Sequence, residues 1–175
     1  MIYLALLSDG DDALTEQEKR KRRCCFTGHR PEKLRMCETE AKQALAKAMD
    51  AALMAGKRTF ISGMARGVDI WAAELVLQRR TVDSSIHLIC ALPHPGFEKR
   101  WSIQWQRRYQ AVLQKADLIR EITPVFSMGS YQARNQWMVD RSSLVIAVFN
   151  GERGGTKNTI DYAVAHGVDV AMIDG

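Results

Sequence analysis

Short apolar runs alternate with longer amphipathic stretches from Cys24 to the end of the chain. Six of these runs have the length of a strand, namely residues 24–27, 59–62, 86–92, 118–122, 144–149 and 168–173. Runs that are apolar on both faces are typical of parallel strands with helices on each side. We therefore expect all six strands to be covered on both faces.

The stretches between these runs carry apolar residues at helical spacing. The residues in question are Ala41, Leu45, Ala48, Met49, Ala52 and Leu53, then Val68, Ala72, Leu75 and Val76, and later Ile103, Tyr109, Val112 and Leu113. Gly56 and Gly167 stand where a glycine commonly ends a helix. The alternation predicts an α/β protein with a three-layer Rossmann-like fold, in which a mainly parallel sheet of about six strands lies between helices.

The length of 175 residues favours one domain. Residues 8–23 are polar and have no apolar face, although Thr15 and Glu18 have the spacing of a helix capping box. Residues 19–23 are five consecutive basic residues, which fit either a solvated linker or a contact with nucleic acid. We expect residues 1–23 to form a loosely attached N-terminal extension and residues 24–175 to form the domain.

Composition excludes several classes of protein. An apolar fraction of 46% and a charged fraction of 26% are close to those of ordinary globular proteins. The cysteines at 24, 25, 37 and 90 lack the spacing of a zinc site or a redox pair, so we expect no metal and no cofactor. No apolar run approaches the ~20 residues of a membrane span, and residues 1–7 lack the basic start of a signal peptide. We therefore expect a cytoplasmic protein without a membrane partner.

Three glycine-containing turns follow three of the expected strands. The first turn, residues 27–31, contains Thr27, Gly28, His29 and Arg30; the second, residues 62–69, contains Ser62, Gly63, Arg66, Gly67 and Asp69; and the third, residues 150–156, contains Gly151, Arg153, Gly154, Gly155 and Thr156. All three lie at the carboxyl ends of strands, where open α/β sheets bind their ligands. These turns are the candidate ligand-binding site.

Glycine lets the backbone approach a phosphate closely, and the helix that follows each turn offers unpaired N–H groups to an anion. Arg30, Arg66 and Arg153 would add charge-assisted hydrogen bonds. The alternative is that each glycine serves only the geometry of its turn. Three such turns with arginines favour a ligand site. None of them matches a Walker A loop or a spaced GxGxxG, so neither an ATPase nor a standard dinucleotide dehydrogenase is supported.

Four further features have two interpretations each. Arg134 and Asp140 either reach the cleft or belong to the surface of a helix, which also carries the candidate Asn135. Trp101, Trp105 and Tyr109 recur every four residues, so they form a stripe that either packs in the core, which we favour, or stacks on bases. His29 and His94 lie in loops after strands, where each is either a proton donor or a hydrogen-bonded surface residue.

Several sequence blocks together resemble the YpsA-like family of uncharacterised bacterial proteins in the SLOG superfamily. The blocks are CFTGHRPEKL, FISGMARGVDIWAAE, ICALPHPGFEKRW, KADLI and YQARNQWMVDRSSLVIAVFNGERGGTKNTIDYA, and they cover about residues 24–173. The superfamily includes the LOG phosphoribohydrolases and the DNA-processing protein DprA. The resemblance implies a Rossmann-like fold and a homo-oligomer.

The resemblance also implies roles for individual residues. Gly28, Gly63, Gly67, Gly154, Gly155 and Thr156 match ligand-loop positions, and Arg134 falls where LOG enzymes carry an arginine ahead of their PGGxGTxxE motif. Thr159 takes the place of the catalytic glutamate of that motif, and Asp161 lies two residues later. The segment SGMARGVD is similar to the SGxARGxD turn of DprA.

Three functions remain as hypotheses. The preferred one is a protein that binds a nucleotide, a nucleotide sugar or a related phosphate ligand, acting as a sensor. The enzyme alternative is a phosphoribohydrolase, with Arg134 positioning the substrate and Asp161 or Asp69 as the acid/base group. The third is a single-stranded nucleic-acid-binding protein that uses residues 19–23, Arg100, Arg107 and Arg108 as a phosphate track.

Overall fold

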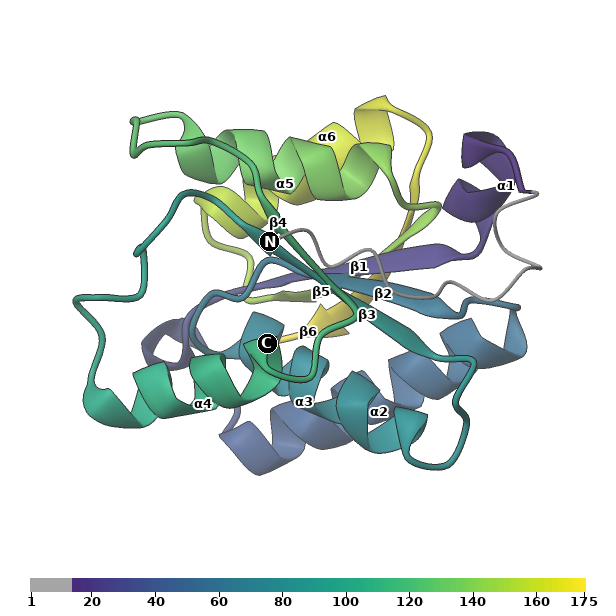
Figure 1. The fold of residues 1–175 in the computed structure, drawn as a ribbon, viewed down its shortest axis with the longest axis horizontal. Coiled ribbons are helices and arrows are strands. Elements are labelled where there is room, and N and C mark those ends of the chain that lie inside the picture. The colour runs from purple at the N-terminus through teal and green to yellow at the C-terminus, as the bar shows by residue number, and fades with distance from the viewer. Residues whose placement is uncertain (1–13) are drawn as a thin grey trace.

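The computed structural model describes residues 14–175 and has thirteen helices and strands in that range (Figure 1). In chain order they are α1 (Glu16–Lys21), β1 (Arg23–Gly28), the 3-10 helix η1 (Pro31–Lys33), α2 (Glu38–Met54), β2 (Thr59–Ser62), α3 (Val68–Arg80), β3 (His87–Leu92), α4 (Ile103–Leu113), β4 (Leu118–Glu121), α5 (Ser130–Asp140), β5 (Leu144–Phe149), α6 (Gly155–Ala165) and β6 (Asp169–Asp174). The six expected strands are all present.

The six strands form one sheet in the order β4-β3-β2-β1-β5-β6, and every pairing between neighbours is parallel. Cys25 in the middle of β1 pairs with Ile61 of β2 and Val145 of β5, which sets the register of the central strands. The chain runs outward from β1 to β4 and then returns to place β5 beside β1. The order therefore reverses between β1 and β5, at the kind of switch point where open α/β sheets place ligands.

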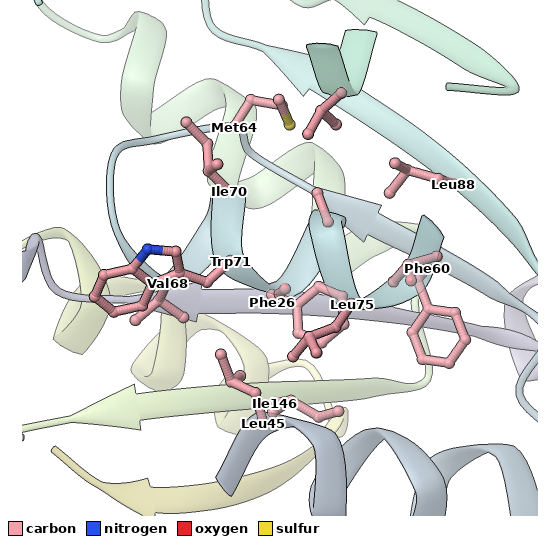
Figure 2. Close-up of a cluster of buried hydrophobic side chains, with 14 of the residues drawn as sticks. Phe26, Leu45, Phe60, Met64, Val68, Ile70, Trp71, Leu75, Leu88 and Ile146 are labelled. Atoms are coloured by element: carbon pink, nitrogen blue, oxygen red, sulfur yellow. The ribbon is translucent and has the colours of Figure 1, made fainter. Parts of the chain in front are cut away.

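Helices cover both faces of the sheet, as expected. Figure 1 shows α2, α3 and α4 on one face and α5 and α6 on the other. On the first face, strand residues Phe26 and Phe60 stack with their ring centroids 5.8 Å apart, and Leu45, Trp71 and other helix residues pack over them (Figure 2). The fold is therefore the expected three-layer Rossmann-like α/β arrangement.

The buried positions of α2 follow the helical period, because Ala41, Leu45, Met49 and Ala52 all face the sheet. The helix ends as expected, since its C-cap is followed by Gly56 with a φ of +86°. In α3 the six residues from Val68 onward are all buried, including the charged Asp69. A helix that is buried on most sides has no clear amphipathic pattern. The spacing of its apolar residues therefore predicts fewer buried residues than α3 has.

The expected burial is wrong at both edge strands and at Ile103. No residue of β6 is buried, and Met172 in this strand is 53% exposed. All four residues of β4 are exposed, including Leu118 and Ile119, because β4 is an edge strand that the helices do not reach. Ile103 opens α4 and is 60% exposed, so its helical spacing does not place it in the core. The aromatic stripe does pack in the core: Tyr109 is 3% exposed and Trp105 lies against Trp71 with 6.3 Å between ring centroids.

Helix α1 begins with the expected capping box between Thr15 and Glu18. Arg20 donates from Nε to the carbonyl of Ser142 at 3.0 Å, so this part of the N-terminal extension contacts the domain next to the start of β5. The rest of the expected extension, residues 1–13, lies outside the described residues. None of the helices in the described part of the chain combines the length and the apolar character that a membrane crossing needs.

Candidate functional site

The three glycine turns meet at the carboxyl edge of the sheet because β2, β1 and β5 are neighbours in the strand order. The second turn leads into α3, and the third leads into α6. The N-caps of these two helices, Gly67 and Gly154, provide no side-chain hydrogen bond. The first N–H groups of both helices therefore lack the partner that a capping side chain would supply.

The first and second turns touch each other closely. A Cβ on Gly28 would lie 2.5 Å from Cγ2 of Val68, and a Cβ on Gly67 would lie 2.8 Å from Cδ of Pro31. Gly67 also has a φ of +90°, a backbone conformation that favours glycine. At these two positions packing and backbone geometry alone require glycine, so the two residues are no evidence for a ligand.

The centre of the site lies where Gly63, Arg134 and Asp69 come together. Arg134 projects from α5 and is 5% exposed, and its Nη1 donates a hydrogen bond to the carbonyl oxygen of Gly63. A Cβ on Gly63 would lie 2.5 Å from that Nη1 and 2.8 Å from Oδ2 of Asp69. The structure thus brings the second turn, with Gly63 and Asp69, together with Arg134 of α5, which is distant in the sequence.

Asp69 and Arg134 interact electrostatically in a buried environment. Burial raises the pKa of Asp69 to about 6, although the positive charge of Arg134 and a hydrogen bond from the N–H of Ala65 at 3.2 Å oppose this rise. Burial also lowers the pKa of Arg134, and the carboxylate of Asp69 opposes that shift. A buried carboxyl group with a pKa near neutrality is a common feature of functional sites.

Ser62 holds the second turn rather than facing outward. Its buried hydroxyl donates to the carbonyl of Asp69 at 2.8 Å and accepts from the N–H of Met64 at 3.1 Å. Met64 has a φ of +59°, which is uncommon outside glycine. The hydroxyl of Ser62 thus supports a constrained backbone, and its only proton is already committed to Asp69.

Asn135 lies near both Arg134 and the third turn. Arg134 donates from Nε to Oδ1 of Asn135 at 2.8 Å, and Nδ2 of Asn135 is the nearest atom to a Cβ built on Gly155, at 3.9 Å. Gly151 and Gly154 have φ values of +89° and +146°. The third turn therefore needs glycine for its backbone conformation, while the space around it remains open.

His29 links the first turn to the end of β5. Its ring is 6% exposed and stacks on Phe149 with 5.6 Å between centroids, and its Nε2 has no hydrogen-bond partner among residues 14–175. Burial and the charge of Lys33 lower the pKa of His29, which favours the neutral imidazole. Thr27 of the same turn is also buried, whereas Arg30 is exposed.

The arginines of the turns do not supply the central positive charge. Arg66 pairs with Glu32 at 3.1 Å, and both Arg30 and Arg153 are exposed. The buried cation of the site is instead Arg134, which comes from α5. Arg134 was a candidate in the sequence, but its place beside the second turn was not visible there, because α3, β3, α4 and β4 separate that turn from α5 along the chain.

Of the two acid/base candidates for hydrolysis, only Asp69 lies at the centre of the site. Asp161 is on the exposed side of α6 and pairs with Lys157 one turn earlier. Thr159 occupies the position expected for a catalytic glutamate; it is fully buried and its hydroxyl donates to the carbonyl of Gly155 at 2.8 Å. Asp161 and Thr159 thus have structural partners within α6. Asp140 accepts a hydrogen bond from Tyr162 at 2.9 Å.

The basic residues considered for a nucleic-acid track do not line one surface with the turns. Residues 19–23 lie at α1 and the start of β1, at the amino edge of the sheet opposite the turns (Figure 1). Arg108 is held by Glu38 and Glu74, each with a contact of 2.7 Å. A hollow of about 430 Å³ between α3 and α4 includes Arg108, but it is away from the glycine turns. Within the described residues, no three metal-binding side chains gather as a metal site would require.

The parallel sheet, its strand order and the turns at its carboxyl edge define a Rossmann-like α/β domain. The family model described as YpsA, the YspA SLOG family, matches residues 24–171, and the chain belongs to this family. This confirms the resemblance noted in the sequence.

Curated relatives have no assigned activity in their descriptions. An uncharacterised SPbeta prophage-derived protein, YoqJ of Bacillus subtilis, is 31% identical over 119 residues, which cover 61% of this chain and 70% of YoqJ. A UPF0398 protein of Bacillus pumilus is 22% identical over 80% of this chain and 84% of its own. A UPF0398 protein of Staphylococcus epidermidis is 29% identical, and the match spans about half its length, 47%.

Solved structures with low sequence identity share the fold. DprA of Streptococcus pneumoniae aligns with a TM-score of 0.64 at 20% identity, over 87% of this chain and 50% of that chain. DprA of Helicobacter pylori, which binds single-stranded DNA, aligns with the same TM-score at 19% identity, over 89% and 66%. TM1055 aligns with a TM-score of 0.55 at 14% identity, over 85% and 72%.

Proposed function

We propose that the protein binds a nucleotide or a nucleotide sugar by its phosphate at the carboxyl edge of the sheet, and that it acts as a ligand sensor. Arg134 is the observation that carries this proposal. Its buried guanidinium uses Nε and Nη1 for Asn135 and Gly63, while Nη2 makes no hydrogen bond to the described part of the chain. A guanidinium held in place with donors to spare is a good phosphate ligand.

The two helix N-termini support the same conclusion. Both α3 and α6 begin at a glycine without a side-chain cap. Unpaired N–H groups and the positive end of the helix dipole favour an anion at such positions. The third turn also has free space, since nothing lies within 4 Å of a Cβ on Gly151 or Gly154. We therefore place the phosphate between the start of α6 and Arg134.

Two variants of Gly155 test this placement. Gly155→Asp should fold, because an acidic residue in the first turn of a helix is favourable, but its carboxylate should occupy the anion site and abolish binding. Gly155→Ala is the matched control and should still bind, because its Cβ would meet only Asn135 Nδ2 at 3.9 Å. The measurement is the shift in melting temperature with AMP, ADP-ribose and UDP-glucose. Unchanged binding by Gly155→Asp would refute the site.

A second candidate function is cleavage of the N-glycosidic bond of a nucleoside monophosphate. The raised pKa of Asp69, about 6, favours it, because a group that titrates near neutrality can act as an acid or a base. In this case Asp69→Asn should still bind AMP but release no adenine, as measured by chromatography. Recovery of intact AMP from the unmodified protein would leave the sensor function as the proposal.

A further inference from the structure

An aromatic cluster lies beside Arg134, just beyond the end of β3. Three rings pack edge-on against His94: Phe97, Phe126 and Tyr131, with centroid distances of 6.1, 5.2 and 5.9 Å. The guanidinium carbon of Arg134 lies 6.0 Å from the centre of the Tyr131 ring. The cluster is therefore next to the cation that we assign to phosphate.

Two rings of this cluster, those of Phe126 and Tyr131, are exposed. Phe97 is 8% exposed and packs against Trp101 and Tyr109, so the core accounts for it. Phe126, by contrast, is 61% exposed and Tyr131 is 38% exposed. Aromatic rings exposed together beside a polar site commonly contact a ligand.

The loop that carries Phe126 is held firmly in place by hydrogen bonds. Thr123 donates from its hydroxyl to the carbonyl of Pro93 at 2.7 Å. The hydroxyl of Ser130 accepts from the N–H of Ser127 at 2.9 Å and lies 2.9 Å from the hydroxyl of Thr123. The polar groups of the loop are thus paired inside it, while its aromatic side chain faces solvent.

His94 adds an unused hydrogen-bonding atom to the cluster. Its Nδ1 lies 3.0 Å from the carbonyl oxygen of Pro95, which can only accept, so Nδ1 carries a proton and the neutral ring has Nε2 as an acceptor. Nε2 is buried, and within residues 14–175 it has no partner. A buried acceptor without a donor costs free energy that a ligand N–H group could recover.

We propose that His94, Phe126 and Tyr131 form the subsite for the nucleobase of a nucleotide. This inference rests on the proposed function, in which the phosphate of the same nucleotide binds near Arg134. The base stacks on Phe126 and Tyr131, and one of its N–H groups donates to Nε2 of His94. Because Phe126 is mostly exposed, its side chain can turn outward and admit the base without disturbing the core. A nucleobase fits because it combines a planar face with N–H donors on its edge.

The experiment compares nucleotides with the matching ligand that lacks a base. Calorimetric titration of the full chain should give at least a tenfold lower Kd for the tightest of AMP, GMP, CMP and UMP than for ribose 5-phosphate. Phe126→Ala should raise the nucleotide Kd several-fold, toward that of ribose 5-phosphate, and leave the latter unchanged. His94→Phe, which keeps a ring but removes Nε2, should weaken the nucleotide several-fold and spare ribose 5-phosphate.

Met128→Ala is the control variant, since Met128 is 94% exposed in the same loop, and it should change neither Kd. Equal affinity of the unmodified protein for the nucleotides and ribose 5-phosphate would overturn the base subsite and leave the phosphate site intact. Loss of ribose 5-phosphate binding in Phe126→Ala would also overturn it, because Phe126 would then serve the phosphate site. Absence of binding to all five probes would overturn the proposed function, and the subsite with it.

Discussion

The second and third glycine turns both carry the chain from a strand into a helix at the carboxyl edge, yet their surroundings differ. The second turn is filled by its neighbours: a Cβ on Gly63 would meet Arg134 and Asp69 at less than 3 Å. The third turn is open, because nothing lies within 4 Å of a Cβ on Gly151 or Gly154. The glycines of the two turns are therefore required for different reasons.

This difference in packing indicates different roles for the two turns. The second turn holds buried charged groups in position through Ser62, whose hydroxyl bonds on both sides of the turn. The third turn leaves the start of α6 accessible, and Asn135, which is hydrogen-bonded to Arg134, lies close to it. In this interpretation the second turn provides rigidity and charge, and the third provides the space for a ligand.

The largest effect should come from removing Arg134, the cation of α5 that packs against the second turn. Arg134→Met leaves the buried carboxyl of Asp69 without its positive neighbour and the carbonyl of Gly63 without a donor, which should lower the free energy of unfolding by about 3–5 kcal/mol. Arg153→Met, in the open turn, replaces an exposed side chain and should change it by less than about 0.5 kcal/mol. Urea unfolding measures both, and similar losses would contradict the contrast between the turns.

The pH dependence of stability should report the burial of Asp69. Because its pKa in the folded protein is about 6, above the ordinary value of 3.8, the folded state favours the protonated group. Its contribution to stability is full below about pH 4 and is lost as pH rises to about 6, a change of roughly 3 kcal/mol. Urea unfolding of the unmodified protein and Asp69→Asn at pH 4 and pH 7 should show this change in their difference. A difference independent of pH would disprove the raised pKa.

The smallest effects come from adding one methyl group to each turn. Gly63→Ala should cost about 1–3 kcal/mol, because its Cβ would overlap Arg134 Nη1 at 2.5 Å. Gly155→Ala should instead stabilise the protein by up to about 1 kcal/mol, since alanine favours a helix more than glycine does. Thermal unfolding of the two variants compares them directly. A loss of stability in Gly155→Ala would show that the third turn is packed after all.

Much of the fold could be predicted because its signals are local. Each strand is a short apolar run, and helix ends such as the one before Gly56 follow from backbone preferences. The prediction of coverage failed at β4, where Leu118 and Ile119 are exposed. An apolar run indicates a strand, but only its place in the sheet determines whether a helix covers it.

The candidate site was only partly predictable, because its residues are brought together by tertiary structure. The turns could be located, since glycine after a strand is visible in the sequence. The sequence did not show which of these glycines are required by packing. Gly28, for example, must be glycine because a Cβ would overlap the side chain of Val68, forty residues later. The cluster of Phe126 and Tyr131 around His94 was missed, because an exposed aromatic residue in a loop leaves no periodic pattern.

The sequence by itself therefore determined the strands, the helices, the α/β class, the family and the three turns, all of which depend on local patterns or on ordered motifs. Only the tertiary structure decided that Arg134, and not the arginines of the turns, is the buried cation beside Asp69. The physical reason is that burial and charge proximity depend on the order of strands and the packing of α5. Those long-range contacts raise the pKa of Asp69 and leave Nε2 of His94 without a partner among residues 14–175.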